Sequence, residues 1–243
     1  MIWIIGGTSD AVKIADLLLD RQKSVMVSAT TAYGIDYVKS KPVHVVQQKL
    51  ETSDMQDLIK DYKVECAIDA SHPFAENVSR NAMEACRLEG IRYLRFERKS
   101  IALKQAQYYE NYEQITAHLS QTKGNILLTI GSKNLYRFSV VDVERLTARV
   151  LPHPDSLARC TAAGLKLHQI IAVKGPLTQE TNKALMIEYG IAHLVTKDTG
   201  TEGGLLEKVK AARELGILVH LLQRPRIAYP EVYDDYNELM AEM

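Results

Sequence analysis

The sequence predicts an α/β protein of two domains, each with a parallel sheet whose strands alternate with helices. Short apolar runs alternate with stretches of helical period along most of the 243 residues, which is the pattern of β-α-β units. The alternation is interrupted between about 98 and 123, where the polar and aromatic stretch 105–112 lies. A shift of about 126 residues then aligns parts of the two halves, which favours two domains of similar construction.

We expect the first domain to comprise residues 1–98. Its predicted strands lie at about 2–5, 24–29, 43–46, 64–69 and 91–96, and its predicted helices at about 8–20, 52–61 and 74–88. The first helix has a broad apolar face that includes Ile14 and Leu18 beside the polar Lys13 and Asp16. Such a face predicts that the helix packs on the sheet.

We expect the second domain to comprise residues 99–243. Its predicted strands lie at about 125–129, 146–150, 168–173, 192–196 and 217–222, and its helices near 132–136, 154–162, 178–189 and 203–214. The shift of about 126 places residues 90–94 on 216–220 and Arg98 on Arg224. We therefore favour two Rossmann-like domains with a cleft between them. The identities are few, so a shared α/β period is the alternative, and a terminal strand can also complete the sheet of the other domain.

The composition describes a folded protein without a global electrostatic field. Apolar residues make up 46% and charged residues 25%, and Lys+Arg and Asp+Glu both total 30. This balance argues against nucleic acid and acidic membrane surfaces as partners, although a small anionic ligand remains compatible with it. No signal peptide or apolar run of roughly 18 residues is visible, so a cytoplasmic location is expected.

The cysteines and histidines do not predict a metal site. Cys66, Cys86 and Cys160 are widely spaced and form no Cys-x-x-Cys motif, which argues against a disulfide framework and a structural zinc site. The seven histidines do not pair with acidic or cysteine neighbours at ligand spacing. A catalytic metal is therefore not expected.

The first predicted strand ends in the glycine turn Gly6-Gly7-Thr8. Glycines between a strand and a helix let backbone N–H groups approach a phosphate at the helix N-terminus. The full G-x-G-x-x-G fingerprint is absent, and a tight turn with an N-cap is the structural alternative. At the end of the second strand, Ser28 and Thr30 stand where a carboxylate would select a free ribose. This favours NADPH over NADH, with an ordinary polar strand end as the alternative.

The segment Ser71-His72-Pro73-Phe74 follows a predicted buried strand and precedes a helix. Ligands bind at the carboxyl ends of strands in open α/β sheets. His72 beside Phe74 is a candidate for contact with a nicotinamide or a substrate carboxylate, and for proton donation. A capping histidine with a buried phenylalanine is the structural alternative.

Several strands of the second half also end in hydroxyl, glycine or basic residues. These residues are Gly131, Ser132 and Lys133 after one strand, Arg149 within the next, Lys174 after the third, and Lys197, Asp198 and Thr199 after the fourth. Such turns can hold a carboxylate or a phosphate. Each alone is also compatible with a solvated turn.

Taken together, these motifs resemble the precorrin-6A reductase family of cobalamin biosynthesis, and the resemblance runs nearly end to end. It is carried by 6–8, 69–75, 149–152, 174–176, 196–200 and 224–225. Ser71 stands where the family commonly has Thr, and Thr199 where it commonly has Ser, so both hydroxyls are kept. The segment 200–203 departs from the family in length or glycine content.

The resemblance implies a two-lobed, Rossmann-like enzyme that uses NADP(H), with NAD(H) as the alternative, to reduce one C=C bond of a corrin-ring precursor. The product is precorrin-6B or its cobalt form. We therefore hypothesise that 6–8 hold the pyrophosphate, that Ser28 and Thr30 lie near the adenosine ribose, and that 71–74 face the nicotinamide. His72 is the candidate proton donor, and solvent is the alternative donor.

The corrinoid precursor carries many carboxylate arms, so the resemblance implies a substrate site rich in cations and N–H donors. The candidate substrate-binding residues are Gly131, Ser132, Lys133, Arg149, Lys174, Lys197, Asp198, Thr199 and Arg224. Two other functions stay open at this stage. One is an NAD(P)H reductase of another polyanionic small molecule, and the other is a non-catalytic sensor of a nucleotide or tetrapyrrole.

Overall fold

The computed structural model describes residues 1–243 except 31–34, 36–37, 39 and 201–203. The chain divides into two compact units: the first contains residues 1–99 and 225–243, and the second contains residues 100–224. Each unit contains one six-stranded sheet in which all pairings are parallel. The predicted α/β class with two parallel sheets is thus confirmed.

The strands of the first unit are β1 (Ile2–Ile5), β2 (Val25–Ala29), β3 (His44–Gln47), β4 (Cys66–Asp69), β5 (Arg92–Phe96) and β12 (Val232–Tyr233). Its helices are α1 (Ser9–Asp20), α3 (Thr52–Asp61), α4 (Glu76–Glu89) and α9 (Tyr236–Ala241). The strand order is β12-β5-β4-β1-β2-β3. From β1 the chain adds β2 and β3 on one side, and then β4 and β5 on the other side. The topological switch point therefore lies between β1 and β4.

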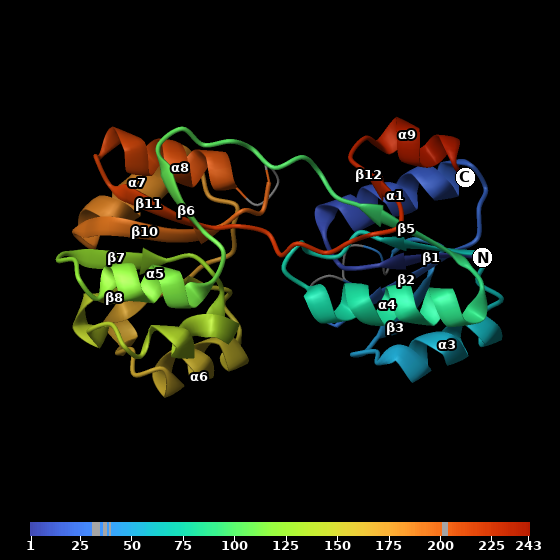
Figure 1. Ribbon diagram of the computed structural model, residues 1–243, viewed down its shortest axis with the longest axis horizontal. Coiled ribbons are helices and arrows are strands. Elements are labelled where there is room, and N and C mark those ends of the chain that lie inside the picture. The colour runs from blue at the N-terminus through green and yellow to red at the C-terminus, as the bar shows by residue number, and fades with distance from the viewer. Residues whose placement is uncertain (31–34, 36–37, 39, 201–203) are drawn as a thin grey trace. The chain divides into compact units, whose positions relative to one another are not determined.

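Helices cover both faces of this sheet, with α1 and α9 on one face and α3 and α4 on the other (Figure 1). Because side chains alternate along a strand, β1 contributes to both cores. Ile2 and Ile4 pack with the α1 residues Ile14 and Leu18, whereas Trp3 packs with residues of α3 and α4. The sheet is thus buried on both sides, as expected for parallel strands.

The strands of the second unit are β6 (Ala106–Tyr109), β7 (Asn125–Leu128), β8 (Leu146–Val150), β9 (Ile170–Ala172), β10 (Ile191–Lys197) and β11 (Leu218–Leu222). Its helices are α5 (Tyr112–Leu119), α6 (Pro154–Ala162), α7 (Gln179–Glu188) and α8 (Leu205–Glu214), with short 3₁₀ segments at Ser132–Phe138, Val143–Arg145 and Leu167–Gln169. The order β6-β11-β10-β7-β8-β9 places the switch point between β7 and β10. Helices α7 and α8 cover the same face of this sheet (Figure 1).

The C-terminal segment differs from the predicted domain ranges. Residues 225–243 belong to the first unit rather than to a second domain of 99–243. β12 pairs with the edge strand β5, and α9 buries Leu239 and Met240 in the core beside α1. The segment thus lies where it removes apolar surface from water, and it is the terminal strand that the sequence left as an alternative.

The stretch 98–123, for which no elements were predicted, contains β6 and α5. β6 lies at the edge of its sheet, and Gln107 and Tyr108 on it are exposed, so it lacks the apolar run that marks a buried strand. The segment predicted as a helix near 132–136 is a 3₁₀ helix. The shift of about 126 residues places β5 directly on β11. Of the described helices, none is long and apolar enough to span a bilayer.

Candidate active site

The glycine turn after β1 packs against the end of β4. Gly6 has a φ of +125°, and a Cβ added to it would lie 2.8 Å from the Cα of Ser71 and 2.9 Å from the carbonyl oxygen of Ala70. A side chain at this position is therefore excluded by backbone atoms as well as by conformation. The structure thus brings two of the predicted motifs, 6–8 and 71–74, together at the switch point of the first sheet.

Thr8 is the N-cap of α1. Its hydroxyl donates to the carbonyl of Ala70 at 2.8 Å and accepts from the backbone N–H of Ala11 at 3.1 Å. This is the N-cap role that the sequence gave as the structural alternative. The side chain thus ties the start of α1 to the end of β4, and the first turn of α1 lies where a helix N-terminus can hold a phosphate.

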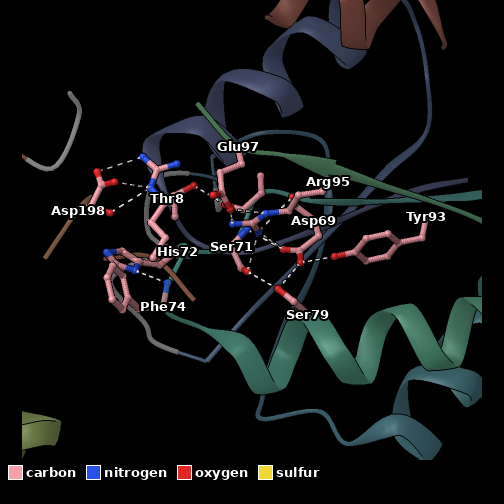
Figure 2. A network of polar contacts seen from close by, with 12 residues as sticks. Thr8, Asp69, Ser71, His72, Phe74, Ser79, Tyr93, Arg95, Glu97 and Asp198 are labelled. Atoms are coloured by element: carbon pink, nitrogen blue, oxygen red, sulfur yellow. Dashed lines mark hydrogen bonds and ion pairs between the residues drawn. The ribbon is translucent and has the colours of Figure 1, made fainter. Parts of the chain in front are cut away.

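A buried network of polar side chains holds the end of β4 in place (Figure 2). Asp69 and Arg95 are both 0% exposed, and their ion pair measures 3.0 Å from Nη1 to Oδ1. The Asp69 carboxylate also accepts hydrogen bonds from the Ser71 backbone at 2.9 Å and from the Ser79 and Tyr93 hydroxyls at 2.6 Å each. The Ser71 bond fixes the backbone that follows β4, and the other bonds join Asp69 to α4 and β5.

The guanidinium of Arg95 has a second carboxylate partner. Its Nη2 donates to Glu97 at 2.6 Å, its Nη1 donates to the Ser71 hydroxyl at 3.2 Å, and it lies 5.1 Å from the ring centroid of Tyr229. Burial lowers the pKa of Arg95, but the charge of Asp69 outweighs this effect together with the other acidic neighbours, so the net shift is upward. Burial and the Asp69 charge also raise the pKa of Tyr93, which keeps its hydroxyl a donor.

His72 follows this network on an exposed turn. Its Nδ1 accepts a hydrogen bond from the Phe74 backbone at 3.2 Å, and the two rings lie 5.8 Å apart. Pro73 and Phe74 are half-buried, and α4 begins at Glu76, two residues after its predicted start.

The two residues predicted near the ribose occupy different environments. Ser28 is buried within β2, where its hydroxyl accepts a hydrogen bond from the Trp3 indole at 2.9 Å. Thr30 directly follows β2 and is exposed. Ser28 thus has a packing role in the core, and Thr30 is the one of the two whose side chain lies at the carboxyl edge of the sheet.

In the second unit, the end of β10 carries an ordered acid–base cluster. The Asp198 carboxylate is 4% exposed, accepts from the Ser100 hydroxyl and pairs with Arg224, whose Nε lies 3.3 Å from Oδ2. Arg224 also donates to the Asp198 carbonyl at 3.2 Å. These bonds hold Asp198, directly after β10, and pair it with Arg224. Beside them, the Thr199 hydroxyl is buried without a partner among the described residues.

Lys197 ends β10 and is half-buried. Burial, and in second place the charge of Lys133, lowers the pKa of Lys197 to about 8. Gly131 precedes Ser132 and Lys133 with a φ of +79°, so the turn after β7 uses a conformation that favours glycine. Lys174 follows β9 and is exposed. The predicted residues in these three turns thus lie at the carboxyl ends of β7, β9 and β10.

Arg149 lies in β8 and donates to the Asn182 side chain of α7 at 2.7 Å. Burial lowers its pKa. Sequence reasoning missed a second cation nearby, Lys208 of α8, which is 4% exposed. The signal was present, because Lys208 lies on the same helical face as the apolar Leu205 and Ala212.

The described residues contain no group of three or more His, Cys, Asp or Glu side chains arranged to hold a metal ion. The three cysteines are free and buried. Burial raises the pKa of the Cys66 thiol to about 11, so it is not a thiolate at neutral pH.

Comparison with known proteins identifies the family. The family model described as "Precorrin-6x reductase CbiJ/CobK" matches residues 1–243. The chain belongs to the precorrin-6x reductase family. It is 38% identical over 251 residues to a protein of Priestia megaterium named cobalt-precorrin-6A reductase. This alignment covers 99% of this chain and 96% of the relative. A protein of the same name from Methanocaldococcus jannaschii is 34% identical over 241 residues, covering 98% and 95%.

The fold agrees with this assignment. The solved structure "CobK precorrin-6A reductase" superposes with a TM-score of 0.83 at 24% identity and covers 99% of this chain and 95% of that one. Membership of the precorrin-6x reductase family makes the chain an oxidoreductase of cobalamin biosynthesis and implies a corrinoid precursor as substrate and a nicotinamide as cofactor. It therefore favours the reductase over the two alternatives that the sequence left open.

Replacing Asp69 by Asn should strongly destabilise the first unit. The substitution keeps the shape of the side chain but removes its charge. Arg95 is left with one carboxylate partner, Glu97, and the Ser79 and Tyr93 hydroxyls, which both donate to Asp69, meet an amide that can accept at only one of its two end atoms. We expect a loss of about 3–5 kcal/mol in the free energy of unfolding, measured by denaturant titration with the fluorescence of Trp3, the one tryptophan of the chain. Asp57→Asn, at an exposed site of α3, is the control. Equal stability of the two variants would contradict the stabilising role given to the buried Asp69–Arg95 network.

Proposed function

We propose that the protein reduces one C=C bond of precorrin-6A or cobalt-precorrin-6A with hydride from NADPH. The observation that carries this proposal is the match of the family model to the whole chain, residues 1–243. The geometry is compatible with it, because each unit has a switch point at which ligands bind in open α/β sheets. One of these switch points has a glycine turn before a helix N-terminus, and the other is rich in cations.

The residues of the first switch point fit a dinucleotide. Gly6 is held against β4 by the close backbone approach described above, and α1 begins with its N-cap at Thr8. In this proposal the backbone N–H groups of 6–8 and of the first turn of α1 bind the pyrophosphate. Ser71, His72, Pro73 and Phe74 line the nicotinamide side, where the Asp69 network fixes their backbone.

The end of β2 favours NADPH over NADH. Ser28-Ala29-Thr30 contains no carboxylate, and a carboxylate at this point is what selects a ribose without a 2′-phosphate. We place Thr30 beside the adenosine ribose. Ser28, which is bonded to Trp3, supports the strand beneath it.

The carboxyl edge of the second sheet is the proposed substrate site. Gly131, Ser132, Lys133, Arg149, Lys174, Lys197, Thr199 and the ordered pair Asp198–Arg224 supply its donors and charges. Carboxylate arms of the precursor are matched by ammonium and guanidinium groups, whose hydrogen bonds to ionised acceptors are the strongest of their kind. Asp198 and Arg224 act by fixing the loop, and Lys197 binds substrate directly.

The chemistry requires a hydride and a proton. When bound, the reduced nicotinamide supplies the hydride to one carbon of the C=C bond. The protein orients the two reactants, and a proton must reach the other carbon. The ring of His72 is exposed. We propose its imidazolium form as the donor, which delivers one proton and becomes neutral imidazole.

The proposed activity is tested by anaerobic incubation of the protein with metal-free or cobalt-loaded precursor and each reduced cofactor. We expect oxidation of NADPH, followed at 340 nm, only when a precursor is present, and a higher kcat/KM with NADPH than with NADH. Formation of the dihydro product is checked by mass spectrometry. Binding of NADPH without its oxidation in the presence of both precursors would instead support a sensor.

The role of His72 is tested by His72→Ala. A general acid contributes about 10²- to 10⁴-fold to the rate, so we expect kcat to fall by at least about 10²-fold with little change in the KM for NADPH. His153→Ala is a matched control, because His153 also precedes a proline and its Nδ1 accepts from the Asp155 backbone at 3.2 Å. If both variants keep near-normal turnover, solvent is the proton donor.

Substrate binding should weaken as the pH rises through about 8, because Lys197 then loses its charge. Removing the like charge in Lys133→Met should raise the pKa of Lys197 and move this midpoint to higher pH. The measurement is the pH dependence of kcat/KM for the precursor. Lys123→Met, on the exposed residue before β7 at the opposite edge of the sheet, should leave the midpoint unchanged. A common midpoint in all three proteins would remove Lys197 from the site.

A further inference from the structure

Helix α8 carries a lysine on the face that packs against the second sheet. Lys208 is 4% exposed and lies on the same face as Leu205, Ala211 and Ala212, all 0% exposed. Its Nζ donates one hydrogen bond, 3.4 Å long, to the hydroxyl of Thr196 in β10. Lysine is almost never buried to this degree unless its charge is paired. The position of Lys208 therefore calls for an explanation other than packing.

The nearest buried side chains do not neutralise this ammonium. Arg149 approaches from β8, and its charge is the second cause, after burial, that lowers the pKa of Lys208 to about 7. The bond of Arg149 itself goes to the neutral amide of Asn182. Among the described residues, neither cation forms an ion pair with a carboxylate. The buried Lys208 and the half-buried Arg149 thus place two cations in one region of the unit.

Glu207 is the carboxylate that acts on Lys208, and it compensates the charge only in part. Its charge is the third-ranked influence on the pKa of Lys208, which still shifts downward. Its Oε2 is buried without a hydrogen-bond partner among the described residues, so it forms no hydrogen bond with the Lys208 ammonium. The cluster of Arg149, Lys208, Thr196 and Glu207 retains a net positive charge when Lys208 is protonated.

The cluster lies toward the ligand-binding edge of the sheet. Arg149 and Thr196 are each the last residue but one of their strands, β8 and β10, and these two strands flank β7. Lys208 lies in the first turns of α8, whose N-cap Gly204 provides no side-chain hydrogen bond. Both cations therefore lie toward the carboxyl edge of the sheet, where ligands bind in open α/β folds.

We propose that Lys208, together with Arg149, binds one carboxylate arm of the corrinoid substrate. This inference rests on the proposed function and adds a buried anchoring residue to it. A carboxylate offers two oxygens that can accept from the guanidinium of Arg149 and the ammonium of Lys208 at once. Its charge compensates the excess positive charge of the cluster, which the described side chains do not.

Stability of the free protein separates this role from a structural one. The pKa of Lys208 in the folded protein is about 7, below its ordinary value of 10.5. At a pH between these two values, Lys208 is protonated in the unfolded chain but largely deprotonated in the folded protein. Stability should therefore rise with pH over this interval, and the charged lysine is unfavourable in the folded state at neutral pH. A residue kept for packing would stabilise the protein, whereas a residue kept for binding need not.

The kinetic test uses Lys208→Met, which keeps most of the volume and removes the charge. We expect the KM for the precursor to rise about 10-fold or more, with kcat and the KM for NADPH little changed and with the same or a higher Tm. Lys210→Met, on an exposed residue of the same helix, is the control and should match the wild type. A rise in the KM for NADPH in place of that for the precursor would assign the pair to a cofactor phosphate and overturn the proposal.

A double-mutant cycle tests whether both cations hold the same group. If Arg149→Gln and Lys208→Met each weaken the same contact, the double variant should lose less affinity than the product of the two single losses. Fully multiplicative losses would show that the two cations act on separate groups. Loss of Tm in Lys208→Met with an unchanged KM would make Lys208 a purely structural residue.

A binding test does not depend on reduction. With lysine labelled by ¹³C and ¹⁵N, the pKa of Lys208 is measured by NMR in the free protein and with propane-1,2,3-tricarboxylate, a small polycarboxylate. We expect the pKa to rise from about 7 toward the ordinary value, and not in Arg149→Gln. This shift in a protein that fails to reduce either precursor would support the anion site and refute the proposed function. An unchanged pKa in an active reductase would overturn the anion site alone.

Discussion

The buried ion pair between Asp69 and Arg95 is the interaction on which the first unit's carboxyl edge depends. It joins β4 to β5 at 3.0 Å and connects α4 through the Ser79 hydroxyl. Tyr229, from the returning C-terminal segment, lies over the guanidinium. A pair of this kind is stable only when its remaining donors and acceptors are satisfied, and here Ser71, Tyr93 and Glu97 satisfy them. The turn that follows β4 is consequently held at Ser71, whose backbone donates to Asp69 and whose hydroxyl accepts from Arg95.

The two units place charge in their interiors in different ways. In the first unit, the buried guanidinium of Arg95 meets two carboxylates. In the second unit, Arg149 bonds to an amide and Lys208 to a hydroxyl, and burial lowers the pKa of each. The first arrangement is complete within the protein and suits a site that is positioned in advance. In the second, neither cation forms an ion pair with a carboxylate of the described residues, and this is the basis of the proposed carboxylate site.

The sequence predicted the elements whose physical signal is local. Buried parallel strands read as apolar runs, so β1, β4 and β5 and their counterparts β7, β10 and β11 lie close to their predicted positions. β6 and β12 were not predicted, because an edge strand keeps one side in water and needs no such run. The return of residues 225–243 to the first unit depends on packing between distant segments, which periodicity does not report. The same holds for the candidate site: Thr8, His72 and Lys197 were predicted from their place at or after strand ends, whereas the hydroxyl bond of Ser28 to Trp3 and the burial of Lys208 are properties of the folded interior.

The return of the C-terminal segment also sets an order of events on the ribosome. Residues 225–243 are translated after the entire second unit, residues 100–224, so β5 stays without its neighbour β12 while that unit emerges. During this interval Phe96 and the α1 face that Leu239 and Met240 later cover are open to water or to chaperones. The second unit needs no later segment and can fold as soon as its last strand is released. The second unit can thus complete its fold before the first, although the first begins at the N-terminus.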